Sequence, residues 1–415
     1  MISTPRRIAV LSDIHIGSSA RSRDLCPASR AESIPDEQFC AAFEDLVARD
    51  NIWADHLIVS GDISSKAKHD EFLLASELIE RWASVLRVPA EEIYFVPGNH
   101  DVDWAVQDMG DDDEGSRTLR WEQRYDPIIR GEHLFSSRMR AAVASLFVEP
   151  FATIWESERL LLCGLNSSAH DTPFNKPHFG FASPDSLSWL RAELSRRPFT
   201  VGQLRVFVVH HHALPFSDPY PRISAFNDFS LLANSDALQS LLREHCFGLL
   251  VHGHKHVPRF ETILVSSDFP IHVLGAGSFS VDLESGYAGS FTNQFHLISI
   301  EGRLTESGPL CGTLFNWAHT GPNGWRPSSR TYTGIDHQVG FGYIVSLEEA
   351  KKIIQELVSA RIATAQMVTW SELVSTNGHL SYLRPGTQME ALLAVAKAHR
   401  LKIAGRPPGD VVLYR

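Results

Sequence analysis

Short apolar runs that end in polar clusters recur along the first 280 residues of the chain. Each run is rich in Val, Ile and Leu and lacks the alternation of a half-exposed strand, which is typical of strands buried on both faces. The runs occupy residues 7–12, 56–61, 92–98, 204–209, 247–253 and 271–278. We therefore expect six strands in the interior of one domain.

Helical patterns lie between several of these runs, most clearly at residues 36–50 and 70–86. Strand and helix in alternation predict a layered α/β domain. In such domains ligands collect beyond the carboxyl ends of the strands, and each polar cluster falls at such an end. The expected functional site is therefore one edge of the sheet.

The pattern changes between residues 104 and 150, where we expect a helical insertion. Its acidic run at 111–114 is typical of a solvated loop, because adjacent carboxylates repel one another. The arginines that follow could instead face a substrate; they are Arg117, Arg120, Arg124, Arg130, Arg138 and Arg140.

A second change in composition sets an expected boundary at residue 300, with residues 301–415 forming a connector and a small α-rich appendage. We expect residues 301–345 to be ordered, because Trp317 and Trp325 suit burial. Ser346 and Glu349 have capping-box spacing at the start of a helix over 346–363, and a second helix is expected over 387–403. Residues 346–415 are too few for an independent hydrophobic core to be expected. We expect this segment to pack on the first domain, as a lid over the site, or on a second copy of the chain in a homo-oligomer.

The composition and net charge of the chain exclude several classes of protein. The chain has 415 residues, 43% of them hydrophobic, and a net charge of −11. This acidic balance of charge argues against wholesale wrapping of nucleic acid or an anionic membrane. The five cysteines contain no C-x-x-C pair, no run of about 18 apolar residues could span a bilayer, and no signal peptide is recognisable. A cytoplasmic protein without disulfides is expected.

The clusters themselves carry the chemistry. Taken alone, most of them are compatible with ordinary turns. Together they bring carboxylate, amide and imidazole groups to one sheet edge, a mixture that suits divalent Mn, Fe, Zn or Ni. Seven such groups exceed the four of a structural zinc site and suit two cations that share a carboxylate. The groups are Asp13, His15, Asp62, Asn99, His210, His254 and His256.

The order D-x-H, G-D, G-N-H-D, H-x-x and G-H-x-H resembles the calcineurin-like metallophosphoesterase superfamily over residues 6–300. The spacing is most similar to bacterial cyclic-nucleotide phosphodiesterases. This resemblance implies a four-layer α/β sandwich, in which two mixed sheets face each other between helices. It also implies hydrolysis of a phosphodiester, a cyclic nucleotide or another small one, by a water that two metal ions (Mn, Fe, Zn or a mixture) activate.

The resemblance also implies a role for each residue. One metal would bind Asp13, His15, Asp62 and His256, and the other Asp62, Asn99, His210 and His254. His100 would donate to the phosphate or leaving oxygen, with Asp101 orienting it. The segment after residue 209 departs from the family pattern, because its proline is displaced to Pro215, so His211 is an alternative ligand to His210.

Other readings stay open at this point. Asn166 and His170 follow an apolar run and could contact substrate, although a hydrogen bond within the loop is the simpler role. A nuclease acting on DNA or RNA is the second candidate function. A metal-binding regulatory protein without catalysis is the third.

Overall fold

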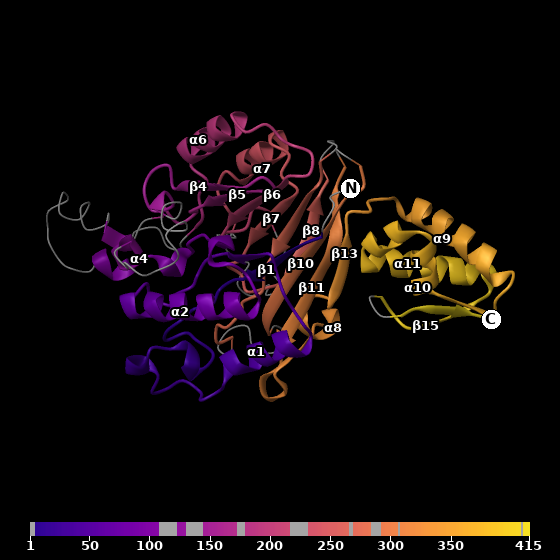
Figure 1. Ribbon diagram of the computed structural model, residues 1–415, viewed down its shortest axis with the longest axis horizontal. Coiled ribbons are helices and arrows are strands. Elements are labelled where there is room, and N and C mark those ends of the chain that lie inside the picture. The colour runs from indigo at the N-terminus through magenta and orange to yellow at the C-terminus, as the bar shows by residue number, and fades with distance from the viewer. Residues whose placement is uncertain are drawn as a thin grey trace, which may run out of the picture.

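A computed structural model describes residues 5–107, 123–129, 144–171, 179–215, 231–264, 269–283, 292–305, 308–407 and 410–415. Two large mixed sheets face each other across a shared hydrophobic core, and helices flank both (Figure 1). This arrangement confirms the predicted four-layer α/β sandwich.

The first sheet has the strand order β12-β11-β10-β1-β2-β3, with β13 also paired to β11. Its three parallel strands are β1 (Arg6–Leu11), β2 (His56–Val59) and β3 (Ile93–Phe95). The antiparallel strands are β10 (Asn293–Arg303), β11 (Leu310–His319), β12 (Trp325–Pro327) and β13 (Gln338–Phe341). Helices α1 (Phe39–Arg49) and α2 (His69–Val85) share its hydrophobic core.

The second sheet has the order β4-β5-β6-β7-β9-β8. Parallel strands β5 (Leu160–Leu165), β6 (Leu204–Val209), β7 (Leu249–His252) and β9 (Ile271–Gly275) lie between the antiparallel edges β4 (Ala152–Glu156) and β8 (Arg259–Ile263). Helices α6 (Pro184–Ser195) and α7 (Ser235–Glu244) cover its outer face.

Strand β6 shows why the apolar runs do not alternate with polar residues. Val206 and Val208 belong to the core shared with the first sheet, whereas Phe207 and Val209 belong to the core beneath α6 and α7. Both faces of the strand are therefore buried in apolar surroundings.

The expected connector is instead part of the first sheet. Strand β10 runs through residue 300, the expected boundary, and β11 pairs with it over ten registered positions. The two tryptophans are buried, as expected: Trp325 stacks on Phe279, and Trp317 Nε1 donates to Asp50 Oδ2 at 2.8 Å. The first sheet therefore ends at Phe341, and the next helix begins at Leu347.

The C-terminal unit contains α9 (Leu347–Ile362), α10 (Trp370–Thr376) and α11 (Pro385–His399), with a sheet of β14 (Met367–Thr369), β16 (Val412–Tyr414) and β15 (Lys402–Ala404) in that order. Ser346 Oγ accepts the Glu349 backbone N–H at 3.1 Å, so the predicted cap is present. The two predicted helices are α9 and α11.

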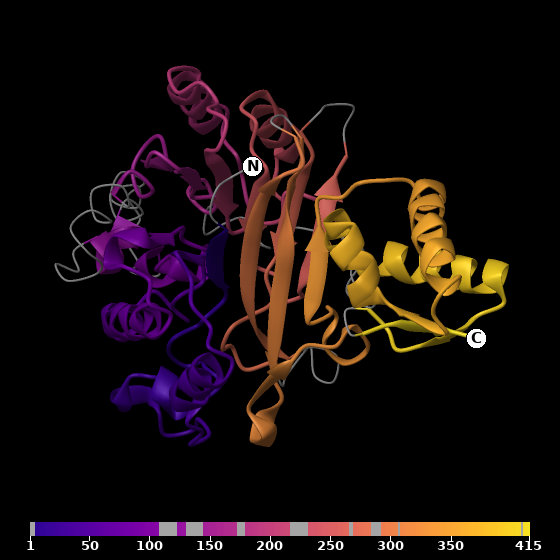
Figure 2. The ribbon, with the colours of Figure 1, turned by 45° about the vertical axis from the view of Figure 1, so that its right-hand side comes forward.

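The C-terminal unit has a hydrophobic core of its own, which includes Ile354, Val358, Leu392 and Leu413. The expectation that its apolar stripes bury against the first domain is therefore wrong. The unit contacts that domain beside the strand β13 (Figure 2): the Tyr343 N–H donates to Tyr382 O at 3.3 Å, and the Arg384 side chain donates to the Thr262 hydroxyl.

Two expectations from composition can be compared with the structure. All five cysteines are free thiols, four of them buried. Within the described ranges, no helix is both long and apolar enough to cross a bilayer. The predicted insertion lies mostly outside the described residues; α4 (Asp126–Ile129) is the helix described within it.

Candidate metal centre

The polar clusters meet at the carboxyl ends of β1, β2, β3, β6 and β7, as the strand pattern predicts. Six side chains form two groups, and within each group one potential ligand atom per residue lies within 4.8 Å of the others. The first group is Asp13, His15 and His256, and the second is Asp62, His210 and His254.

Asp62 lies between the two groups. Its Oδ2 atom is 3.1 Å from His210 Nε2 in its own group and 3.7 Å from His15 Nε2 in the other. Asp62 is buried, so these contacts are made away from water. One carboxylate thus faces imidazoles of both groups, which is the geometry that a bridging ligand needs.

Asn99 joins the second group through its amide oxygen. Asn99 Oδ1 lies 3.0 Å from His254 Nδ1, in the 3-10 turn η4 (Asn99–Asp101) that follows β3. The His254 backbone N–H donates to Asp13 Oδ1 at 3.1 Å, so the same loop also contacts the first group. All seven residues expected as ligands are therefore brought together.

The structure distinguishes His210 from His211. His210 Nδ1 is 2.9 Å from Ser60 O, and a carbonyl can only accept, so Nδ1 donates and Nε2 faces Asp62. His211 Nδ1 instead contacts Ser167 Oγ at 2.7 Å. His210, not the alternative His211, belongs to the group.

The backbone is strained at most of these positions. Five of the seven residues have φ between +50° and +83°, the left-handed region that non-glycine residues rarely adopt. They are Asp13, His15, Asp62, His254 and His256. Such strain costs on the order of 1–3 kcal/mol per residue and concentrates at functional sites.

Two glycines make room for the side chains. A Cβ atom at Gly61 would collide with the ring of His210, and one at Gly98 would collide with Asp62. Gly61 also has a φ of +98°. The G-D and G-N-H-D motifs therefore need glycine for steric reasons.

The protonation states suit cation binding. Burial lowers the pKa of His15, His254 and His256, which favours the neutral imidazoles that bind metals. Burial opposes a proton on His210, but the charge of Asp62 outweighs it and raises the pKa of His210 to about 9. A bound cation would displace this proton from the ring. Against burial, His210 in turn holds the pKa of Asp62 well below its usual range.

His15 provides a direct test of fit. It is 3% exposed, and neither of its ring nitrogens has a hydrogen-bond partner among the described residues. An unsatisfied buried polar group costs about 1–3 kcal/mol. A cation next to Asp13 and His256 would satisfy this ring, so the donor set fits a metal ion.

His100 lies beside the two groups without joining either. Its ring meets the His15 ring edge-on, with centroids 4.6 Å apart, and is partly exposed. His100 Nδ1 donates to Ser65 O at 3.0 Å, which leaves Nε2 available for a substrate.

Asp101 does not orient His100 directly, contrary to the expectation. Its carboxylate accepts the backbone N–H groups of Gly98 and Ser64, at 2.9 and 3.0 Å, and the Ser64 hydroxyl. Burial, followed by the charge of Asp62, raises the pKa of Asp101 to about 6. Asp101 therefore ties the loop after β2 to the loop after β3.

Three further candidates have structural contacts. Asn166 donates to Leu146 O and to the Tyr125 hydroxyl, at 2.8 and 3.0 Å. Arg124 is buried and donates to Ala169 O at 2.9 Å. His170 packs edge-on against the rings of Phe151 and Phe181. The other five arginines of the insertion lie outside the described residues.

Sequence reasoning missed the carbonyl oxygens of Ser60 and Ser65, which fix the rings of His210 and His100. A backbone carbonyl exists at every residue, so the sequence carries no signal for this role.

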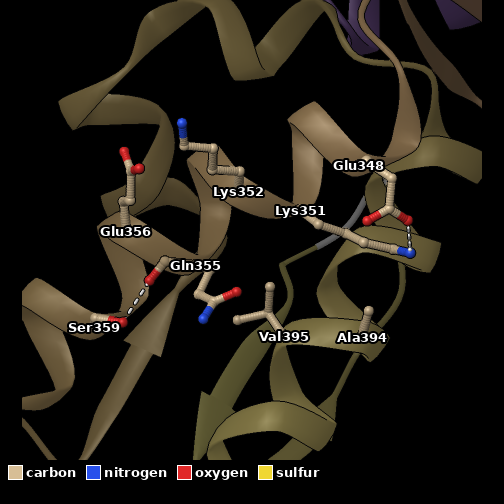
Figure 3. Close-up of a pocket in the computed structure, with 8 residues that line it drawn as sticks. All are labelled: Glu348, Lys351, Lys352, Gln355, Glu356, Ser359, Ala394 and Val395. Carbon is tan, nitrogen blue, oxygen red and sulfur yellow. Dashed lines mark hydrogen bonds and ion pairs between the residues drawn. The ribbon is translucent and has the colours of Figure 1, made fainter.

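A cavity of about 670 Å³ lies between α9 and α11 in the C-terminal unit, away from the metal ligands (Figure 3). Its rim is charged and solvated: Lys351 Nζ contacts Glu348 Oε1 at 2.6 Å. No group of potential metal ligands occurs there among the described residues. The strand-end cluster is therefore the candidate active site.

Comparisons with known proteins bear on this site. A search of curated proteins finds no match. Solved structures that match include purple acid phosphatase PPD1 from yellow lupin (Lupinus luteus) seeds, at 12% identity and a TM-score of 0.46, over 76% of this chain and 52% of that one. The chain thus spans about half the length of that phosphatase.

Two other matching structures have similarly low sequence identity to this chain. One is the phosphopantetheinyl hydrolase of Mycobacterium tuberculosis, at 14% identity and a TM-score of 0.32, covering 65% of this chain and 89% of that chain. The other is Vps29 of Entamoeba histolytica in complex with Zn²⁺, at 12% identity and a TM-score of 0.30, covering 76% and 94%.

The family comparison is the more specific one. The model of the calcineurin-like phosphoesterase family matches residues 6–258, which include all seven candidate ligands. The chain therefore belongs to the calcineurin-like phosphoesterase family.

Proposed function

We propose that this protein hydrolyses phosphodiester bonds with the help of two divalent cations. Asp13, His15 and His256 would hold one ion, and Asn99, His210 and His254 the other, with Asp62 shared by both. The observation that carries the proposal is the position of Asp62, within 3.7 Å of imidazoles from both groups.

Two bound cations would supply an activated water and would neutralise the oxygens of the phosphate. The protein's own contribution is to hold the ligand side chains rigidly. The Ser60 carbonyl fixes the His210 ring, and Asp101 joins the loops that carry Asp62 and Asn99.

His100 is the proposed acid. Ser65 holds its Nδ1, so a protonated Nε2 can donate to the oxygen that leaves the phosphorus. This role also disfavours the regulatory reading, since a protein that only binds metal has no need of a positioned acid beside the ions.

A small phosphodiester such as a cyclic nucleotide is the proposed substrate, on the motif spacing and on the acidic charge of the first domain. A nuclease is the second candidate. It is favoured by the C-terminal unit, where residues 346–415 carry nine basic and six acidic residues, and Lys397, Arg400 and Lys402 are exposed.

One panel of substrates tests the proposal. Protein stripped with a chelator and reconstituted with Mn²⁺, Fe²⁺ or Zn²⁺ is assayed on an aryl phosphodiester, cyclic nucleotides, single-stranded DNA, RNA and phosphomonoesters. The proposal expects metal-dependent turnover of diesters, with small ones preferred. Turnover of monoesters alone would contradict it, and turnover of polynucleotides alone would establish the nuclease.

A further inference from the structure

A cleft of about 580 Å³ lies between the first domain and the C-terminal unit. Its first wall is residues 257–261, which begin directly after the ligand His256. Its other walls are Arg330 with residues 334–339, and the start of α11 from Arg384 to Glu390. The Cα atom of Arg259 is at most about 11 Å from that of His256, because consecutive Cα atoms are 3.8 Å apart.

Two guanidinium groups in this cleft form no ion pair with a carboxylate within the described part of the chain, although the charge of Glu261 acts on Arg384. The Arg384 side chain donates to the Thr262 hydroxyl and forms no ion pair. Arg330 contacts Asp336 through its backbone N–H, at 3.3 Å, and its side chain forms no ion pair. Both groups therefore remain available to an external anion.

The charges of the cleft limit the size of that anion. Three arginines line it, but so do Glu261, Asp336 and Glu390. A long nucleic-acid strand needs a continuous positive track, and the acidic residues interrupt one here. The cleft therefore suits one compact anionic group.

We propose that this cleft binds a second phosphate group of the substrate through Arg330 and Arg384, while the scissile diester lies at the metal centre. The substrate class is a small nucleotide with two phosphate groups, and this inference rests on the proposed function. A guanidinium can bind phosphate with two parallel hydrogen bonds. Binding the remote phosphate would hold the scissile one in place, which raises kcat/KM.

The kinetic test compares a dinucleotide that carries a 5′-phosphate with the same dinucleotide without it. The wild-type protein is expected to prefer the phosphorylated form by roughly 10- to 100-fold in kcat/KM, the effect of one or two charge-assisted hydrogen bonds. Arg384→Gln and Arg330→Gln should bring this ratio close to one, and Arg384→Lys should retain part of it. Arg406→Gln, an exposed arginine outside the cleft, is the matched control and should leave the ratio unchanged.

A binding measurement separates this inference from the proposed function. Calorimetry compares a nucleoside 3′,5′-bisphosphate with the 5′-monophosphate on the Mn²⁺-loaded protein. Tighter binding of the bisphosphate that disappears in Arg384→Gln supports the cleft, even if the protein hydrolyses no diester. Equal binding of the two ligands, or a wild-type preference that both arginine variants retain, overturns it.

Discussion

His210 Nε2 lies 3.1 Å from Asp62 Oδ2, although the two residues are 148 positions apart in the chain and come from different sheets. Both are buried. Two charged groups placed so far from water need strong compensation, and a single removed partner would leave the other uncompensated. The pair therefore joins the two sheets at the point where the proposed chemistry takes place.

Replacing His100 should separate chemistry from metal binding. His100→Ala is expected to keep both metal ions and to lose roughly 10²- to 10⁴-fold in kcat, the usual contribution of a positioned acid. The loss should shrink as the leaving group becomes more acidic, since a good leaving group needs little protonation. Metal analysis and a series of aryl phosphodiesters measure both effects; an equal loss across the series would assign His100 to phosphate binding instead.

Asp101 should stabilise the loops after β2 and β3 and should not take part in the proton transfer by His100. Asp101→Asn keeps one acceptor oxygen but loses the charge that holds three backbone N–H groups, those of Ile63, Ser64 and Gly98. We expect a lower melting temperature and weaker metal binding, with a pH–rate profile of the same shape as that of the wild type. A shifted profile at full metal occupancy would show that Asp101 tunes His100 after all.

Acid should destabilise the first domain through His296, which is far from the metal ligands in the chain and fully buried. The Gly277 N–H donates to His296 Nε2, and His296 Nδ1 donates to Asn316 Oδ1. One ring nitrogen accepts and the other donates, which is possible only for the neutral imidazole. Burial lowers the pKa of His296 to about 4.

The sign of this effect follows from proton linkage. In the unfolded chain His296 binds a proton below about pH 6.5, whereas in the folded chain it binds one only below about pH 4. The free energy of unfolding should therefore fall as the pH falls, by about 2 kcal/mol between pH 7 and pH 5 from this group. His296→Gln should flatten that slope in urea titrations, whereas the exposed His379→Gln should not; identical slopes in all three proteins would refute the assignment.

Removing the C-terminal unit tests its relation to the cleft. A chain ending at residue 345 keeps every strand of the first sheet, because β13 ends at Phe341. It should fold, bind both metals and lose the preference for a substrate with a second phosphate, since Arg384 is removed. A change to a smaller assembly in sedimentation, with the substrate preference retained, would instead assign the unit to self-association.

The strands that meet at the metal centre could be predicted from the sequence because both of their faces are apolar, as Val206 and Phe207 show. Strands β10 and β11 could not. Their buried positions include His296 and Asn316, which satisfy each other across the ladder. A polar residue that finds its partner 20 positions away resembles a surface residue when only the local pattern is read.

The candidate ligands could be predicted because each follows a strand with the residue types that metals bind. The supporting contacts could not, since Ser60 and Ser65 act through backbone carbonyls. The core of the C-terminal unit was also missed. Part of this core is the pair Val368 and Leu413, which face each other across β14 and β16, and the two residues are too distant in the chain for a local pattern to reveal the pairing.

The metal content and turnover of Asp62→Asn test the central claim most directly. The substitution preserves size but removes the charge that faces both groups, so the account predicts fewer than two bound metal ions per chain and loss of diester turnover. Asp36→Asn, an exposed aspartate, should behave as the wild type. An Asp62→Asn protein with two tightly bound ions and wild-type turnover would contradict the shared-carboxylate centre.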